Sequence, residues 1–502
     1  MDPVEQHAHE PDSSFDGGDL DCGGGLLLLI RRHIDPLEPG GLLEILSTDS
    51  TVEVELPAWC RLTGNELFSW TNSGGRSSFL VSKGPFSVRN GDRATPAHRV
   101  QPLRVETSIP ESLPRPAPTP EIAPLSVMGI GSWPRPGWML RAMHDWMEGR
   151  LSDEEFRETG EDAVRLAIDA QVRAGVDVLT DGEQRRDNYA SFVGGLLDNC
   201  QLIPLSDLTA MVDDADKFQR ELRALDVPAG EVRHPVVYGR LGRSRSLAVH
   251  EIEYARTCSD MPVKVALPGP YLLTRTMWLD CLTDRPYETR DELARDVVRV
   301  LREETHFLLS SGAALVQFDE PVLTEVVFGG ERAERTFMCG ALSERLEPGP
   351  ELDFAVGLLN EVVHGLPQER LGLHVCRGNW TPDESAALIG GYGPLVDVLN
   401  RVEVGTLFLE LATPRAGDIE VLSALPDDRR IGVGVVNPKT AEVEPTEEVR
   451  QRISRAINLF GRERVLLTPD CGFATYADNP VSSAQVAEAK LRAIVEARGF
   501  FY

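Results

Sequence analysis

The chain has 502 residues, of which 42% are hydrophobic and 26% are charged, the composition of a globular protein. Its formal net charge of −28 argues against nucleic acids and anionic membranes as partners, because both are bound through clustered lysine and arginine. The apolar run at 25–30 is too short to span a membrane, and the acidic start of the chain does not resemble a signal peptide, so we expect a cytoplasmic protein.

The first part of the chain is expected to form a tail and a separate domain. We expect residues 1–16 to be a disordered tail and residues 17–85 to form a domain that the proline-rich stretch separates from the rest of the chain. Cys22 stands just before the apolar run, in the sequence CGGG. Nothing around Cys60 marks it for reactivity, and we expect it to be a packed core residue.

The stretch from Leu20 to Trp70, followed by FLVSKG, resembles the TusA/SirA family of sulfur carriers. The resemblance implies a two-layer α/β domain with a helix at 25–37 and a strand at 41–48. Cys22 would stand at the N-terminus of that helix, which lowers the pKa of a thiol, and would carry a persulfide whose sulfur comes from a cysteine desulfurase. In that family the reactive cysteine opens a Cys-Pro-x-Pro turn, whereas glycines follow Cys22 here. The alternative is a domain that no longer carries sulfur, in which Cys22 is structural.

Residues 86–125 have the composition of a linker. The segment from Thr95 to Leu125 holds eight prolines and shows no periodic apolar pattern. Proline removes backbone donors and favours extended chain, so we expect a semi-rigid connection that could let Cys22 reach the second domain.

Residues 126–502 alternate short apolar runs with helix-like stretches, the pattern of a parallel (β/α)8 barrel. Clear helix candidates lie at 154–175 and 290–312, the second ending at Gly312. Of nine strand candidates we choose eight for the barrel and interpret the ninth, at 234–242, as a hairpin inserted before the third strand. The eight runs lie at 127–132, 176–183, 263–270, 314–321, 371–378, 406–412, 430–437 and 464–472.

Polar residues stand at the C-terminal ends of these runs, the edge at which barrel enzymes build their active sites. They are Ser132, Asp181, Glu183, Asp319, Glu320, His374, Cys376, Glu410, Asn437, Asp470 and Cys471. Any one of them alone could be a helix cap or a core residue. Their gathering on one predicted rim favours a functional site.

His374 and Cys376 are two positions apart in a predicted strand, so their side chains point to the same side. Together with Glu410 and Cys471, which follow other strands of the barrel, they form the set of nitrogen, sulfur and carboxylate donors that zinc prefers. A rival interpretation makes Cys376 a nucleophile with His374 as its base, which leaves Cys471 and Glu410 without a role. The third possibility is a packed core.

Five motifs resemble, in order, those of the cobalamin-independent methionine synthase catalytic-domain family, whose relatives include epoxyalkane:coenzyme M transferases. They are IGSWPRP, DVLTDGEQRRDN, VQFDEPVLTE, HVCRGN and LLTPDCGFAT, and the resemblance covers about residues 126–502. It implies a β/α barrel with one catalytic Zn²⁺ held by His374, Cys376, Glu410 and Cys471, although Glu410 lies further from Cys376 than in the family.

The same resemblance implies that Gly131, Ser132, Glu183 and Asp319 hold the amino-acid part of a thiol substrate. Carboxylates such as Glu183 and Asp319 suit an ammonium group through charge-assisted hydrogen bonds. With Cys22, these two carboxylates are our candidate catalytic residues. The family's full-length synthases carry a second barrel that helps to bind folate, which this chain lacks, so the methyl donor is left open.

Three functional hypotheses follow. The first is a zinc-dependent transferase that moves a methyl or alkyl group to or from a thiol-type sulfur, with the tethered domain delivering or receiving sulfur. The second is a core methionine synthase that methylates homocysteine, with the N-terminal domain as a docking surface. The third is a non-catalytic barrel that only positions the carrier domain for partner proteins.

Overall fold

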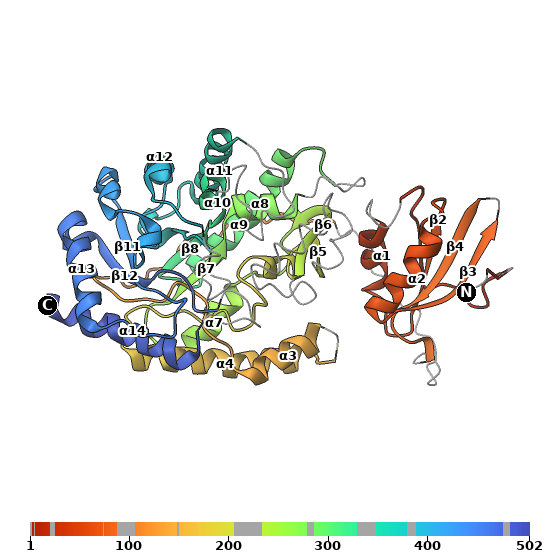
Figure 1. Ribbon diagram of the computed structural model, residues 1–502, viewed down its shortest axis with the longest axis horizontal. Helices are drawn as coiled ribbons and strands as arrows, with labels where there is room; N and C mark the ends of the chain where they lie inside the picture. Colours follow the sequence, from red (N-terminus) through yellow and green to blue (C-terminus); the bar gives the residue numbers. More distant parts are fainter. Residues whose placement is uncertain are drawn as a thin grey trace.

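The computed structural model of the chain consists of a small N-terminal domain and a larger barrel domain (Figure 1). It describes residues 3–4, 6–20, 26–73, 75–87, 106–147, 150–204, 233–278, 286–328, 347–378, 388–474 and 482–502. In these residues no helix is long and apolar enough to cross a membrane.

The N-terminal domain is a four-stranded sheet packed against two helices. Its elements are β1 (Ser13–Asp16), α1 (Leu27–Ile34), β2 (Leu42–Ser47), α2 (Val52–Thr63), β3 (Glu66–Ser73) and β4 (Arg76–Ser82). The strand order is β1-β2-β4-β3, with β1 parallel to β2 and the other pairs antiparallel. Leu26, Ile30, Leu43, Trp59 and Cys60 belong to its core, so the expectation that Cys60 is packed is confirmed.

Two expectations for this domain need comment. The predicted disordered tail is wrong for Ser13–Asp16, which form β1 because Phe15 packs against the core and the backbone pairs with β2. The chain before β1 is also fixed to the domain, because the His7 ring forms hydrogen bonds with the hydroxyls of Ser69 and Ser78, at 2.7 and 2.9 Å. Cys22 lies outside the described residues, and the likeness to sulfur carriers stays a prediction.

The barrel is closed by eight strand segments within the described residues. Six are regular parallel strands: β7 (Lys264–Pro268), β8 (Leu315–Asp319), β9 (Leu371–Val375), β10 (Thr406–Leu409), β11 (Arg430–Val436) and β12 (Val465–Pro469). The first two predicted strands make only isolated parallel bridges. The first segment pairs with β12 through Val127 and Leu467, the two segments pair with each other through Met128 and Val178, and the second reaches the start of β7 through Leu179 and Val263, which closes the ring. Gly129 and Gly131 help to explain the weak pairing of the first segment, since glycine favours strands poorly.

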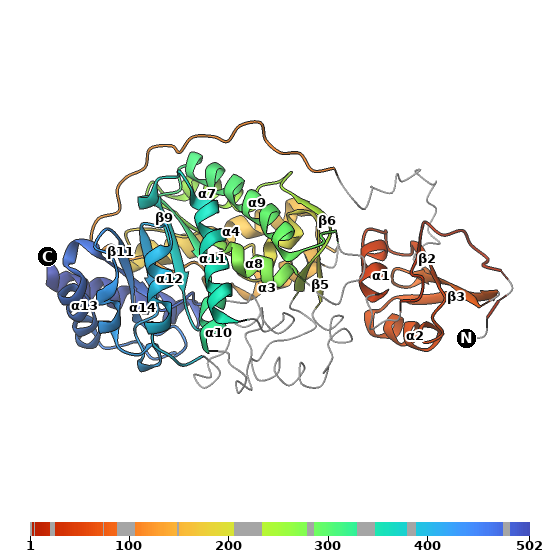
Figure 2. The same ribbon diagram turned by 90° about the horizontal axis from the view of Figure 1, so that it is seen from above.

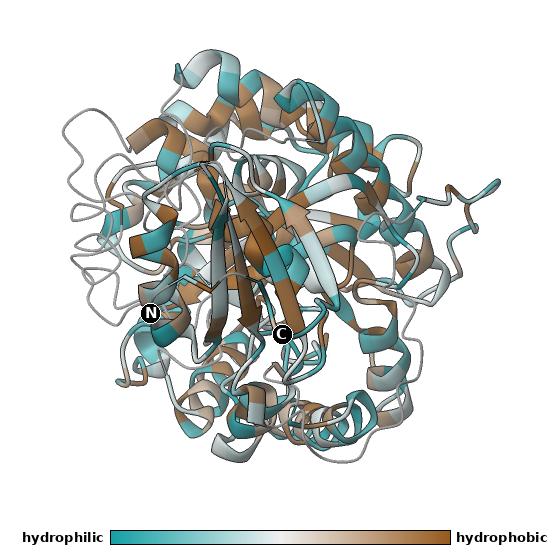
Figure 3. Cartoon of the chain, turned by 90° about the vertical axis from the view of Figure 1, so that its right-hand side faces the viewer, coloured by the Kyte–Doolittle hydropathy of each residue, from teal (hydrophilic) through white to brown (hydrophobic). Residues whose placement is uncertain are grey.

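Helices surround this ring, with their hydrophilic residues outward (Figure 3). They are α3 (Gly137–Met147), α4 (Asp153–Ala174), α7 (Val249–Cys258), α8 (Pro270–Met277), α9 (Arg290–Ser310), α10 (Val322–Phe328), α11 (Pro348–Val363), α12 (Val396–Arg401), α13 (Thr446–Phe460) and α14 (Ala484–Arg498). Both predicted helices are present. The first begins with a capping box formed by Ser152 and Glu155, and the second is followed by Gly312 at a φ of +91°.

The predicted hairpin before the third strand is also present, and the N-terminal domain contacts it. Strands β5 (Asp198–Pro204) and β6 (Arg233–Gly242) pair antiparallel. The Gln201 amide on β5 donates to the Asp35 carboxylate at 2.7 Å, and the Arg32 guanidinium lies 5.1 Å from the centre of the Tyr238 ring on β6. Leu28 of α1 packs into the core of the barrel domain, so α1 forms the contact between the domains.

The described part of the predicted linker lies along the barrel. Residues 106–125 run without regular structure over the outside of the helices (Figure 2). The Ala117 amide donates to the Leu309 carbonyl at 3.0 Å, the Arg370 guanidinium donates to the Ala117 carbonyl at 2.5 Å, and Ile122 is buried. This part of the segment is therefore attached to the barrel and adds no reach to the N-terminal domain.

Candidate functional site

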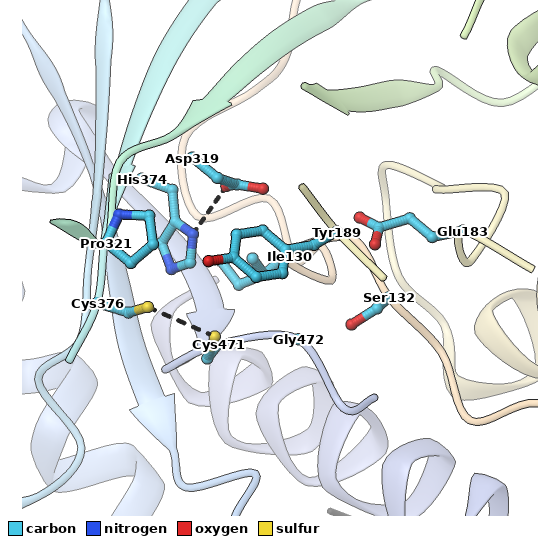
Figure 4. A pocket seen from close by; sticks show the side chains of 10 residues that line it. All are labelled: Ile130, Ser132, Glu183, Tyr189, Asp319, Pro321, His374, Cys376, Cys471 and Gly472. Carbon is cyan, nitrogen blue, oxygen red and sulfur yellow. Dashed lines mark hydrogen bonds and ion pairs between the residues drawn. The ribbon is translucent and has the colours of Figure 1, made fainter. Parts of the chain in front are cut away.

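Three donor atoms converge at the C-terminal ends of the barrel strands. His374 is on β9, Cys376 follows β9 directly, and Cys471 follows β12. The two Sγ atoms are 3.8 Å apart, and all three donors lie within 4.8 Å of one another (Figure 4). The hydrogen bond from the Cys471 thiol lowers the pKa of Cys376 and raises the pKa of Cys471. One imidazole and two thiols are a donor set suited to zinc.

The two ring nitrogens of His374 have different surroundings. Nδ1 lies 2.9 Å from Oδ1 of Asp319, whereas Nε2 is buried and has no hydrogen-bond partner among the described residues. A buried ring nitrogen without a partner is uncommon and calls for an explanation. Metal-bound histidines typically bond a carboxylate through one nitrogen and the metal through the other, so this environment fits a bound metal.

Glu410 does not join this group of donors. It follows β10 and is buried, but one carboxylate oxygen pairs with the Arg415 guanidinium, with Nε at 2.9 Å, and the other accepts from the Arg377 backbone amide at 2.9 Å. Burial raises the pKa of Glu410 to about 8. Its predicted role as a ligand stays a prediction.

Glu183 is held on a strained turn after the second strand segment. Its φ is +53°, and the buried guanidinium of Arg135 donates to the backbone carbonyls of Glu183, Gln184 and Arg186. A side chain on Gly131 would overlap the Glu183 carboxylate, so glycine at that position leaves room for the carboxylate where it now lies. Burial raises the pKa of Glu183 to about 7. Such strain is maintained only where the surrounding structure enforces it, often at functional sites.

Ser132 joins the carboxylate side of the site to the segment that carries Cys471. Its carbonyl accepts from the Phe473 amide at 3.1 Å and its hydroxyl accepts from the Ala474 amide at 3.3 Å. Gly472 leaves room for the Ser132 hydroxyl, because a Cβ there would overlap it. The two walls of the site are therefore fixed to each other.

Most of these side chains line one pocket (Figure 4). The lining residues are Ile130, Ser132, Glu183, Tyr189, Asp319, Pro321, His374, Cys376, Cys471 and Gly472. All predicted site residues in the barrel line it, except Glu410 and Gly131. Sequence reasoning missed Tyr189, although it directly follows the motif DVLTDGEQRRDN, and it missed Ile130, Pro321 and Gly472 within the other motifs.

Four other strand-end residues have structural roles. Glu320 accepts from two backbone amides in the first turn of α8, at 2.8 and 3.0 Å. Asp470 accepts from the two amides that follow Glu410, each at 2.8 Å. Asp181 accepts from the Glu183 amide at 2.9 Å, and Asn437 accepts from the amide two residues later at 3.0 Å. These contacts shape the rim of the barrel.

Comparison with known protein families identifies the barrel. The family described as cobalamin-independent synthase, catalytic domain, matches residues 125–346 and 372–498. The chain belongs to this family. The match agrees with the expected resemblance of residues 126–502 and does not extend to the N-terminal domain.

Relatives of the cobalamin-independent synthase domain support this membership. The methionine synthase of Saccharolobus solfataricus is 26% identical over 368 residues, which are 73% of this chain and 92% of that protein. The methionine synthase of Sulfolobus acidocaldarius is 26% identical over 355 residues, 70% of this chain and 86% of that protein. Together with the family match, they identify the chain as an enzyme of the methyltransferase type.

Solved structures agree on the fold. The B12-independent methionine synthase of Shewanella sp. W3-18-1, solved with selenomethionine, has a TM-score of 0.56 at 21% identity and covers 76% of this chain and 98% of its own. A putative vitamin-B12-independent methionine synthase of Listeria monocytogenes has a TM-score of 0.56 at 18% identity, and the match covers 76% of this chain and 99% of the Listeria chain. At these identities the likeness concerns the fold alone.

Proposed function

We propose that the chain is a zinc-dependent S-methyltransferase that methylates the sulfur of an amino thiol, homocysteine in the first instance. The observation that carries the proposal is one cavity that joins a His-Cys-Cys donor set to two buried carboxylates. The family match and the methionine synthase relatives favour this hypothesis over sulfur exchange with a tethered carrier.

His374, Cys376 and Cys471 would hold the zinc, and Glu410 is the proposed fourth ligand. The chemistry that zinc supplies at such a site is to keep a thiol ionised at neutral pH, where a free thiol with a pKa near 8.5 is mostly protonated. Nε2 of His374, which has no hydrogen-bond partner among the described residues, and the two adjacent thiols fit this role.

Glu183 and Asp319 would hold the ammonium group of the substrate. Oδ1 of Asp319 is engaged by His374, while Oδ2 accepts no hydrogen bond from the described residues and points toward the side of the cavity where Glu183 lies (Figure 4). The carboxylates thus orient the amino-acid part, while the donor set holds the sulfur. The carboxylates of Glu183 and Asp319 and the ring of His374 are buried, and low exposure to water strengthens both interactions.

The rival hypotheses fit the site less well. A Cys376–His374 nucleophile pair would need a hydrogen bond between the two side chains, yet the bond recorded for the Cys376 thiol is to Cys471. A non-catalytic barrel has no use for a buried imidazole nitrogen without a partner beside two thiols. A relative named methionine synthase does not need a second barrel, because the Saccharolobus protein is covered to 92% by 368 aligned residues.

A direct assay tests the proposal. Purified protein is analysed for metal and then incubated with homocysteine, sulfide or a persulfide and a panel of methyl donors that includes methyl folates with one and several glutamates. We expect about one zinc per chain and methionine as the product, measured by mass spectrometry. Protein without zinc, or methylation of sulfide and persulfide but not of homocysteine, would refute it.

A further inference from the structure

A lysine is buried inside the barrel beneath the site. Lys264 on β7 has 1% of its surface exposed, in a strand whose residues are all buried. Its Nζ lies 4.5 Å from the centre of the Phe408 ring, and that ring occupies the space left free by Gly372 and Gly432. Burying a charged group is unfavourable unless it is well paired, so its partners indicate why it is there.

Lys264 begins a continuous chain of hydrogen bonds that ends at the donor set. Its Nζ donates to Oε1 of Gln317 at 2.7 Å, and Nε2 of Gln317 donates to Oδ1 of Asp319 at 2.7 Å. The same oxygen lies 2.9 Å from Nδ1 of His374. The four residues come from β7, β8 and β9, which are neighbours in the sheet, and all are buried.

The direction of every bond in this chain follows from its first member. A lysine ammonium has donors and no acceptor, so the amide of Gln317 must turn its oxygen toward Lys264 and its NH₂ toward Asp319. Oδ1 of Asp319 must then accept, and the bond with Nδ1 of His374 requires that this nitrogen carry the proton. The lone pair is left on Nε2, which is the unpartnered nitrogen.

Two influences on the charge of Lys264 oppose each other. Burial lowers its pKa to about 7, whereas the carboxylates of Asp319 and Glu183 favour the ammonium form, whose N–H groups can only donate. The face of the Phe408 ring also attracts a cation.

We propose that Lys264 and Gln317 are positioning residues for the metal site: they orient Asp319, fix the tautomer of His374 and so present Nε2 as a metal donor. The inference rests on the proposed zinc site but concerns residues that contact neither metal nor substrate. Groups that orient a metal-bound histidine typically change metal affinity by about 10- to 100-fold when removed.

The test is a double variant, Lys264→Met with Gln317→Leu, which removes both polar partners together. Such paired replacement by apolar groups of similar shape avoids leaving a buried group unpaired. Zinc affinity is measured by competition with a chromophoric chelator, and the ring nitrogens of His374 are followed by ¹⁵N NMR in metal-free protein. Lys490→Met is the matched control, because Lys490 is equally buried but pairs with Glu444 at 2.8 Å.

We expect the double variant to bind zinc about tenfold more weakly or worse, and to show both His374 tautomers where the parent shows the Nδ1-protonated form alone. Lys490→Met should keep the parent's zinc affinity and tautomer. A folded double variant with the parent's affinity and tautomer would overturn the inference.

A nearly isosteric variant, Gln317→Glu, covers the case in which the double variant does not fold. It keeps a partner for Lys264 but places a carboxylate against Asp319, so zinc affinity should fall, and an unchanged affinity would again overturn the inference. If the parent itself takes no zinc, the proposed function fails. The tautomer of His374 in the metal-free protein still decides the inference in that case.

Discussion

The Sγ atoms of Cys376 and Cys471 lie 3.8 Å apart although 95 positions separate them in the chain. They follow β9 and β12, and two further strands lie between these in the sheet, so closure of the barrel brings the thiols together. Two thiols at this separation, next to an imidazole, are expected to bind the same metal ion.

Cys471→Ser should therefore lose most of the zinc and most of the activity while the barrel still folds. Residues that only orient a metal ligand change metal affinity by up to about 100-fold. Loss of a ligand itself should therefore weaken zinc binding by at least about 100-fold. Cys258→Ser is the control, because Cys258 lies at the end of α7, outside the site. Metal analysis and circular dichroism check both variants; full zinc content in Cys471→Ser would contradict the ligand assignment.

Glu410→Gln separates the two possible roles of that side chain. If Glu410 is a ligand, zinc affinity falls in Glu410→Gln, whereas Arg415→Met, which removes one of its two ion-pair partners, leaves affinity equal or higher. If Glu410 only pairs with Arg415, both variants lose stability and neither loses zinc. Chelator competition and thermal unfolding of the two proteins distinguish these results.

Glu183→Gln and Asp319→Asn should differ in their effects. Each removes a charge-assisted hydrogen bond to an ammonium group and should raise KM for an amino thiol by about 10- to 100-fold. Asp319→Asn should also weaken zinc binding, because Asp319 orients His374. Steady-state kinetics with homocysteine and with a thiol lacking the amino group provide the measurement. Equal KM changes for both thiols would mean that Glu183 does not bind the ammonium group.

The pH dependence of KM should report Glu183. Burial raises the pKa of this carboxyl to about 7, so its ionised form, which binds the ammonium group, is lost as pH falls through 7. Between pH 8 and pH 6 the ionised fraction falls about tenfold, and KM for an amino thiol should rise accordingly. In Glu183→Gln this dependence should be absent; a parent enzyme whose KM stays constant over this range would argue against the role.

Cys22→Ser tests the sulfur-carrier prediction. If Cys22 forms a persulfide, loading with a cysteine desulfurase adds about 32 Da, the mass of one sulfur, to its tryptic peptide. Cys60 is the internal control, because burial raises its pKa to about 12 and makes it unreactive. No added mass on Cys22, with full transferase activity in Cys22→Ser, would leave the N-terminal domain as a docking module.

Much of the fold could be predicted from the sequence, because strands and helices are set by local patterns. The apolar periodicity of Arg290–Ser310 and the helix-like composition of Asp153–Ala174 are local features, and both helices form where expected. The two-residue spacing of His374 and Cys376 likewise places both side chains on one side of β9 in any fold that keeps the strand. The tail was mispredicted because a four-residue strand such as Ser13–Asp16 has too little pattern of its own and depends on pairing with β2.

The order of the elements and the polar residues at the strand ends could be read from the chain alone, and the donor types among them predict zinc. The partner that each polar group takes depends on the folded barrel, because groups from distant segments compete for the same buried atoms. Asp319 illustrates this: the sequence pointed to a substrate carboxylate, whereas in the barrel one of its oxygens is held between Gln317 and His374. Lys264 had no signal beyond an apolar run, and its role emerges only where β7, β8 and β9 lie side by side.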